Sequence, residues 1–234
     1  MPQAFLGRLG VISFERAMAL EDELCKLRYA GEIPDTILIM EHPPTITMGR
    51  SAQSENVLLS PEELGRRGIT IAHSNRGGDV TFHTLGQIVL HVVMDLRRRE
   101  TPLRGFVADL EDVALRVLES YGVAAVRRSE HPGLWVNGRQ VMAIGLHMGR
   151  GISSHGLSLN VEPNLSSFGV INLCGLPGCE ATSIARELGR SVSTKRVARG
   201  LALAFAEVFR VELQPVTMSY LTKRAQGATA QSCL

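Results

Sequence analysis

The sequence predicts an α+β fold: a central, mostly antiparallel sheet flanked by helices. Helical patterns lie near both ends of the chain, at residues 13–30 and 193–209. Between them, several short β-branched and apolar runs follow one another before the next helical pattern, an order typical of α+β domains. The pair Asn137-Gly138 between two such runs is the strongest hairpin signal in the chain, and hairpins join antiparallel strands.

The first helix begins after Ser13, whose hydroxyl can cap it, and runs to residue 30. Its apolar residues recur at helical spacing, whereas Glu21 and most other charged residues are expected off the buried face. A second helix begins at Ser60-Pro61, a capping residue followed by proline at the first helical position, and ends at Gly68. The apolar runs of this half predict strands at residues 36–40, 45–48, 69–73, 80–83 and 87–95.

A third helix is predicted at residues 106–121, with valine and leucine on one face and a glycine as its stop. The last helix begins at Ser193 or Thr194, and polar residues after it predict a flexible tail at 222–234. We expect a single domain over residues 1–234, and a composition shift near 166–177 leaves open a small helical C-terminal part. The remaining predicted elements are strands at 133–136, 139–148 and 152–161 and a short helix at 183–188.

Composition and charge exclude several classes of protein. Of 234 residues, 44% are hydrophobic and 21% are charged, which is typical of a globular protein that buries a sizeable core. A net charge of +2 gives no electrostatic case for nucleic-acid binding. The first ten residues lack a signal-peptide pattern, and no apolar run approaches the roughly 18 residues of a membrane span. We therefore expect a cytoplasmic protein that binds neither nucleic acid nor membrane.

Four scattered cysteines predict neither a disulfide scaffold nor a metal site, because they form no CxxC pair and have no histidine at zinc-finger spacing. We also expect no cofactor. Cys174 differs from the others because it lies in a glycine-flanked turn before a helix start near Ser183. A thiol at such a junction can feel the positive end of the helix dipole, which favours the thiolate. Cys174 is therefore a candidate nucleophile, and the alternative is a small buried hydrophobe.

The segment 76–83 combines a guanidinium at Arg76, two adjacent glycines and His83 at a strand end. Paired glycines after a strand can cradle an anion or let a ligand chain lie against the backbone. The alternative is an ordinary hairpin turn. The segment is not a dinucleotide-binding fingerprint, since it lacks the GxGxxG spacing and no helix follows it directly.

The run 155–160 alternates along a predicted strand. Alternation places His155 and Leu157 on one face and Gly156 and Ser158 on the other. A single histidine in a strand is more often a hydrogen-bonded structural residue than a functional one, because a buried imidazole must find partners.

These segments resemble, in order, the sequence blocks of the octanoyl (lipoyl) transferases of lipoate biosynthesis. The resemblance extends over essentially the whole chain, and six blocks in order make it specific for the family. It implies the biotin/lipoate protein ligase fold, an α+β domain. The blocks are Glu41-His42-Pro43-Pro44, Thr47-Met48-Gly49-Arg50, Arg76-Gly77-Gly78-Asp79-Val80-Thr81-Phe82-His83, Ala143-Ile144-Gly145, His155-Gly156-Leu157-Ser158-Leu159-Asn160-Val161 and Ile171-Asn172-Leu173-Cys174-Gly175.

The resemblance implies an acyltransferase that moves octanoate from acyl carrier protein to an enzyme cysteine, here Cys174, as a thioester. The octanoyl group then passes to a lysine of a lipoyl domain, in 2-oxoacid dehydrogenases or in the glycine cleavage H protein. A thiolate suits this reaction because ping-pong transfer divides it into two steps. The residues implied to line the acyl pocket are Arg76, Gly77, Gly78, Asp79, Val80, Thr81, Phe82, His83, Ala143, Ile144, Gly145, His155, Gly156, Leu157 and Ser158.

The sequence departs from the family pattern at three places. Gln140 stands where the family has a lysine credited with activating the cysteine, and glutamine cannot titrate. Losing an ammonium there is expected to raise the pKa of Cys174 and to reduce the fraction of it present as thiolate. The family's His-Gly-Pro-Gly-Gln is His83-Thr84-Leu85-Gly86-Gln87 in this chain, which changes a turn near the pocket mouth. Met142, where the family is often smaller, is expected to reshape the groove.

Three functions follow as hypotheses. The first is an octanoyltransferase in which Cys174 has another activator, such as His83 or His155. The second is a cysteine acyltransferase of the same fold with another donor, acceptor or acyl length. The third is a protein that binds acyl groups or lipoyl domains without catalysis. An ATP-dependent ligase is disfavoured, because the chain shows no adenylate-binding glycine loop with its lysine and such a ligase needs no nucleophilic cysteine.

Overall fold

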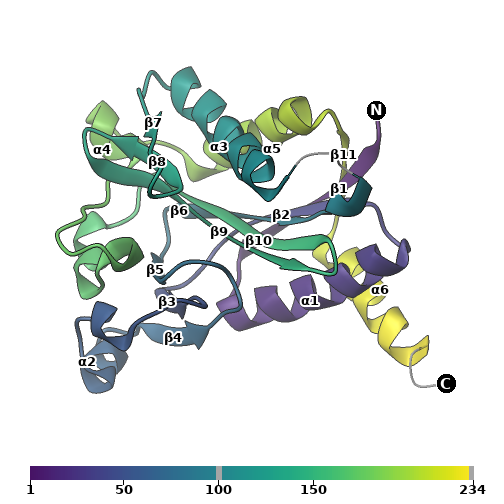
Figure 1. The fold of residues 1–234 in the computed structure, drawn as a ribbon, viewed down its shortest axis with the longest axis horizontal. Helices are drawn as coiled ribbons and strands as arrows, with labels where there is room; N and C mark the ends of the chain where they lie inside the picture. Colours follow the sequence, from purple (N-terminus) through teal and green to yellow (C-terminus); the bar gives the residue numbers. More distant parts are fainter. Residues whose placement is uncertain (99–101, 232–234) are drawn as a thin grey trace.

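The computed structural model describes residues 1–98 and 102–231, and an eight-stranded sheet crosses its middle (Figure 1). From one edge to the other, the strands are β11 (Glu212–Val216), β1 (Gln3–Val11), β2 (Asp35–Glu41), β6 (Gln87–Val93), β10 (Ile152–Asn160), β9 (Arg139–Gly149), β8 (Gly133–Val136) and β7 (Val126–Arg127). Strand β1 pairs in parallel with β2 and β11, and the other neighbours are antiparallel. The prediction of an α+β fold with a mostly antiparallel central sheet is confirmed.

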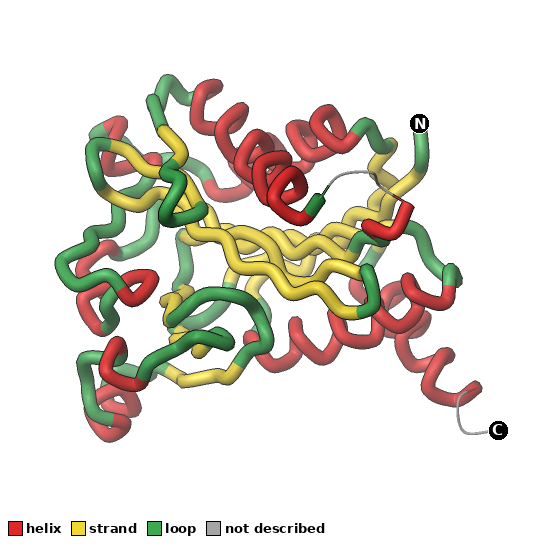
Figure 2. The backbone as a smooth tube through the Cα atoms, viewed as in Figure 1, coloured by secondary structure: helices red, strands yellow, loops and turns green. Residues whose placement is uncertain are grey.

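Helices cover both faces of this sheet, which makes a three-layer molecule (Figures 1 and 2). Helices α3 (Leu103–Ser120) and α5 (Thr194–Phe209) pack on one face, and α1 (Phe14–Ala30) and α6 (Met218–Gln231) lie on the other. Each face has its own hydrophobic core, one centred on Phe106 and Phe205 and the other on Leu24 and Leu38. Within the described ranges, none of the helices has the length and apolar composition needed to cross a bilayer.

A second, three-stranded sheet lies on the α1 side of the large one (Figure 1). Its strands are β4 (Thr70–His73), β3 (Thr45–Met48) and β5 (Val80–His83). A third core joins it to helix α2 (Pro61–Arg66) and to the loop that contains Cys174. The short helices that complete the fold are α4 (Ile184–Leu188) and the 3₁₀ turns η1 (Ser54–Asn56), η2 (Leu96–Arg98), η3 (Leu165–Val170) and η4 (Leu173–Gly175).

The predicted helix starts are confirmed at the level of individual hydrogen bonds. The hydroxyl of Ser13 accepts from the backbone N–H of Arg16 at 3.4 Å. Ser60 caps α2 and Ser193 caps α5 in the same way. These bonds satisfy backbone donors that a helix leaves free at its first turn.

The structure differs from the predictions at both ends of the chain. Strands β1 and β11 form one edge of the large sheet, although neither was predicted. Helix α6 occupies most of the expected tail, and its Leu221 is fully buried; residues 232–234 of that tail lie outside the described residues. Glu21, expected off the buried face of α1, is also fully buried.

Candidate active site

A cavity of about 410 Å³ opens beside Cys174, between the small sheet and β9. Its volume is in the range of small-molecule sites. Leu103, Val107 and Leu146 add apolar side chains to its wall. The predicted site residues that line this cavity are Arg76, Gly77, Gly78, Asp79, Val80, Thr81, Ala143, Ile144, Gly145 and Cys174.

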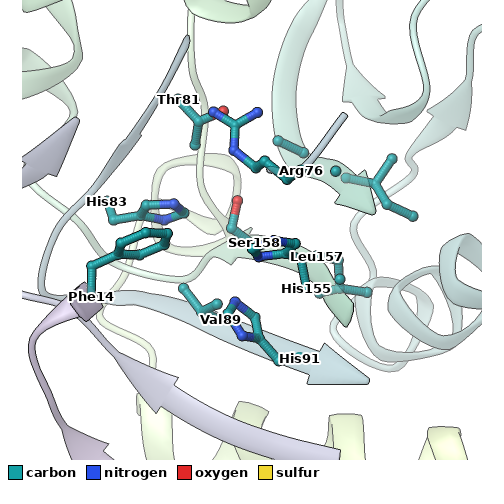
Figure 3. A pocket seen from close by; sticks show the side chains of 13 residues that line it. Phe14, Arg76, Thr81, His83, Val89, His91, His155, Leu157 and Ser158 are labelled. Atoms are coloured by element: carbon teal, nitrogen blue, oxygen red, sulfur yellow. The ribbon is translucent and has the colours of Figure 1, made fainter. Parts of the chain in front are cut away.

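A smaller cavity of about 30 Å³ adjoins it and shares Arg76, Thr81 and residues 143–145 of its lining (Figure 3). Figure 3 shows three histidine rings around it, those of His83, His91 and His155. The remaining predicted residues that line it are His83, His155, Gly156, Leu157 and Ser158, and Phe14, Val89 and His91 join them without having been predicted.

Phe82 is the one predicted pocket residue that lines neither of these two cavities. Its side chain points into the third core, where its ring meets that of Phe168 edge-on with centroids 5.3 Å apart. Strand alternation explains this, because Thr81 and His83 on either side of Phe82 face the cavities.

The turn between β4 and β5 is held together by the Arg76 guanidinium. Its nitrogens donate to the carbonyl oxygens of Thr47 and Asp79, both at 2.7 Å, and to that of Gly77 at 3.0 Å. Burial lowers the pKa of Arg76 to about 10, so it remains charged at neutral pH. With most of its donors taken by backbone, Arg76 shapes the turn and gives the site a fixed positive charge.

Glycines let the segments of this wall approach each other closely. A Cβ on Gly145 would lie 3.0 Å from the carbonyl oxygen of Gly77, and one on Gly156 would lie 2.1 Å from that of Leu90. Gly78 has a φ of 88°, in the left-handed region, where a valine would be strained. Gly77 does not have that constraint on φ, but a Cβ there would lie 3.3 Å from the carbonyl oxygen of Leu146, so added bulk at either glycine disturbs this wall.

The turn that carries Cys174 is tied to a distant segment by two asparagines. The Asn172 amide nitrogen donates to Asn56 Oδ1 at 3.1 Å, and its backbone N–H donates to the Asn56 carbonyl at 2.9 Å. Asn56 in turn donates to Asp79 Oδ2 at 2.8 Å. These bonds hold Cys174 in a left-handed conformation, with a φ of 54°. Strained backbone of this kind clusters at functional sites.

The electrostatics of Cys174 differ from the expected helix-dipole effect. The groups that act on the thiol are Gln140, Arg76 and Asp79, and helix α4, which begins at Ile184, has only 5 residues. Burial raises the pKa of Cys174 above its ordinary value, while the hydrogen bond with Gln140 and the charge of Arg76 oppose this in part. The thiol form therefore predominates at neutral pH.

Gln140 contacts Cys174 directly. The Cys174 Sγ lies 3.4 Å from Gln140 Oε1, and the backbone of Gln140 pairs with Glu180 and Thr182. Its Nε2 is buried and has no hydrogen-bond partner in the part of the chain that the structure describes. As placed, the amide oxygen accepts from the thiol; a half-turn of the amide brings Nε2–H to the sulfur, where it can donate to a thiolate. In either orientation, the Gln140 amide can hydrogen-bond with the sulfur but cannot take up its proton.

The histidines proposed as alternative activators are engaged elsewhere. His83 Nδ1 bonds with Gln87 Oε1 at 2.7 Å, and His155 Nε2 bonds with Asn75 Oδ1 at 2.6 Å. Within the described residues, neither histidine is hydrogen-bonded to Cys174.

His155 also departs from the predicted alternation. Its φ of 59° turns the side chain toward α1, away from Leu157, which packs in the core under α3. The buried carboxylate of Glu21 stabilises this turn, because its Oε1 accepts from the His155 backbone N–H at 2.7 Å. Although burial raises it, the pKa of Glu21 is lowered overall by His91 and His155.

Acid is expected to unfold the protein through its buried histidines. Burial lowers the pKa of His42 and of His155 to about 4, and that of His83 well below its ordinary value. In the unfolded chain these histidines have pKa values near 6.5, so they take up protons as pH falls below 7, whereas the buried histidines of the folded protein stay neutral until about pH 4. The free energy of unfolding therefore decreases as pH falls from 7 toward 4. Each histidine contributes a slope of up to about 1.4 kcal/mol per pH unit.

The measurement is the free energy of unfolding in urea at pH 7.5 and pH 5, with a chelator present. His42→Gln removes one titrating group and is expected to reduce the difference between the two values. A free energy that is the same at both pH values would contradict the prediction.

Comparisons with known proteins identify relatives of the whole chain. Residues 13–206 match the family model described as the lipoyl protein ligase A/B catalytic domain. A protein of Syntrophobacter fumaroxidans named octanoyltransferase is 38% identical over 216 residues, which cover 92% of this chain and 95% of the relative. One of Nitratidesulfovibrio vulgaris, also named octanoyltransferase, is 42% identical over 203 residues, 86% of this chain and 92% of that one.

Solved structures share the fold at much lower identity. A lipoate-protein ligase A bound with ATP superposes with a TM-score of 0.81 at 14% identity, covering 96% of this chain and 93% of its own. A bipartite lipoate protein ligase of Thermoplasma acidophilum gives a TM-score of 0.78 at 13% identity, with 97% and 92% covered.

Proposed function

Because the chain belongs to the lipoyl protein ligase A/B catalytic domain family, we propose that Cys174 carries an octanoyl group as a thioester between two protein substrates. The chain is an octanoyltransferase of lipoate biosynthesis, in line with relatives of that name over most of its length. The observation that carries the proposal is the position of Cys174 at the wall of a cavity of about 410 Å³.

In the first step, the Cys174 thiolate attacks the thioester carbonyl of octanoyl-acyl carrier protein. The new carbon–sulfur bond forms as the carrier thiol leaves, and the carrier sulfur takes up a proton. Exchange of one thioester for another is nearly balanced in free energy, so binding need not drive it. In the second step, the amine of a lipoyl-domain lysine attacks, an amide forms, and the Cys174 thiol is regenerated.

The cavity suits an unbranched C8 chain. Ile144 and Leu146 of β9 face Leu103 and Val107 of α3 across it. The opposite wall is backbone at Gly77 and Gly78, where no side chain narrows the space. We assign acyl binding to residues 76–81 and 143–145, and the adjoining small cavity at the inner end of the pocket to His83, His155, Gly156, Leu157 and Ser158.

A second candidate function is acyl or lipoyl-domain binding without turnover. One observation favours it: the group next to Cys174 is the neutral Gln140, and burial raises the pKa of the thiol. A third candidate is a cysteine acyltransferase with another donor or acceptor, and it rests on the same replacement of the family's lysine by Gln140.

One experiment separates the three. The protein is incubated with octanoyl-acyl carrier protein without ATP, its intact mass is recorded, and lipoyl domain is then added. We expect a mass increase of one octanoyl group on Cys174, followed by its transfer to the lipoyl-domain lysine. An adduct that is never transferred favours another acceptor, and binding of the carrier with no adduct at any pH favours the non-catalytic protein.

A further inference from the structure

A second group of chemically capable side chains lies beneath the small cavity. Glu21 of α1, His91 of β6 and His155 of β10 come from three separate elements and meet in the interior. All three are buried, with exposed fractions of 0%, 4% and 2%. One donor atom from each lies within 4.8 Å of the other two.

Two polar atoms of this group have no hydrogen-bond partner among the described residues. These are Glu21 Oε2 and His91 Nδ1, and both are buried. Leaving buried polar atoms unpaired is unfavourable, and more so for a charged group. His91 Nδ1 lies 3.2 Å from Glu21 Oε1, the oxygen that also accepts from the His155 N–H, and Glu21 Oε2 lies 3.6 Å from His155 Nδ1.

The tautomer of His155 makes the third donor available. Its Nε2 bonds with Asn75 Oδ1, an acceptor, so this nitrogen carries the hydrogen. A neutral ring then has its lone pair on Nδ1, which lies 3.6 Å from Glu21 Oε2. A lone pair facing a carboxylate is unfavourable unless a cation lies between them.

We propose that Glu21, His91 and His155 form a binding site for a divalent transition-metal ion, Zn²⁺ foremost. Zinc bonds of about 2.1 Å in a tetrahedron place neighbouring ligand atoms about 3.4 Å apart. His91 Nδ1 lies 3.2 Å from Glu21 Oε1 and His155 Nδ1 lies 3.6 Å from Glu21 Oε2, so each nitrogen is near this spacing from one oxygen of the carboxylate. Two imidazoles and one carboxylate are a donor set that suits zinc and its neighbours.

The surroundings supply the remaining parts of such a site. Asn75 orients His155 through the nitrogen that does not face the ion, which is the usual arrangement around metal-bound histidine. His91 and His155 also line the cavity of about 30 Å³, which leaves a fourth position open to a water or to a ligand atom (Figure 3). Three protein ligands with one open position is the pattern of a reactive rather than a purely structural zinc site.

Sequence spacing gives no sign of this site, because the three ligands are 70 and 64 residues apart in the chain. The site does not depend on acyl transfer through Cys174, since neither Gln140 nor Cys174 takes part in it.

The competing explanation is an ionic cluster whose only task is to hold the backbone turn at His155. Glu21 Oε1 already serves that turn by accepting from the His155 N–H. The two explanations differ in one respect: the metal site predicts saturable metal binding, and the ionic cluster does not.

The test uses protein stripped with a chelator and titrated with Co²⁺, followed by competition with Zn²⁺. A background of Cys25→Ser, Cys174→Ser, Cys179→Ser and Cys233→Ser removes thiols as ligands, above all Cys25, which lies one turn from Glu21 on α1. We expect one ion per chain by elemental analysis, the visible absorption of four-coordinate Co²⁺ and a rise in Tm. Glu21→Gln keeps an oxygen for the His155 N–H and is expected to weaken binding at least 100-fold, as is His91→Asn.

His147→Asn is the matched control, because His147 is a half-buried β9 histidine outside the group; it should bind within 2-fold of the parent. Asn75→Ala, which removes only the orienting partner, should weaken binding about 10- to 100-fold. Circular dichroism establishes that each variant is folded. If Glu21→Gln does not fold, His91→Asn decides whether the proposal holds. The proposal is overturned if the folded parent shows no saturable binding, or if binding survives in Glu21→Gln and His91→Asn.

Discussion

Cys174→Ser is expected to abolish octanoyl-enzyme formation and transfer to lipoyl domain. Among the described residues, the hydrogen-bond partner of the Cys174 side chain is Gln140, whose amide cannot take up the proton of a serine hydroxyl and so cannot activate it. The loss should be at least about 10³-fold, the scale on which removal of a catalytic nucleophile lowers rates. The measurement is intact mass after incubation with octanoyl-acyl carrier protein, together with lipoyl-domain octanoylation.

Cys179→Ser is the matched control, since it changes a thiol only five residues away. Burial raises the pKa of Cys179 to about 11, so it is a poor nucleophile at neutral pH, and the variant should acylate at the parent rate. An acyl adduct that accumulates normally in Cys174→Ser would show that another group is the nucleophile.

Gln140→Lys is expected to raise the rate of acyl-enzyme formation at pH 7 by at least about 10-fold. An ammonium beside Cys174 stabilises the thiolate, and lowering the cysteine pKa by one unit gives about 10 times more thiolate when that pKa is above 7. In the natural protein the raised thiol pKa means that the rate should climb as pH increases above 7. In Gln140→Lys the rise should begin at lower pH.

The pH–rate profile of both forms from pH 6 to 9 is the measurement, with the free energy of unfolding as a check on the buried lysine. Gln140→Met serves as control, because it fills similar space without a charge and should not accelerate the reaction. A parent rate that is already fast and flat from pH 6 to 8 would mean that another group activates Cys174.

Much of the fold is predictable because its signals are local. Ser13, Ser60 and Ser193 cap the helices that they precede, and the hairpin at Asn137-Gly138 joins β8 to β9. Strand β11 is different, since its partner β1 lies about 200 residues away in the chain. No local pattern specifies that pairing.

The same distinction applies to the candidate site. Cys174 and Gln140 stand out in the sequence, and the structure places them in contact. Glu21 could not be predicted, because it lies in an acidic run, Glu21-Asp22-Glu23, that is typical of an exposed helix face. Its burial follows from the histidines that surround it, which come from β6 and β10. The Asn56–Asn172 contact could not be predicted either, because it joins residues 116 positions apart in the chain.

The parallel pair of β1 and β11 has a consequence for how the protein is made. Strand β1 leaves the ribosome first and pairs early with β2, but its outer edge stays open until Glu212–Val216 has been synthesised. An open strand edge invites pairing with other chains. Nascent chains stalled before residue 212 should therefore associate through β1; in the finished sheet the outermost strand is β11, where Pro215 lacks the N–H that an added strand would use.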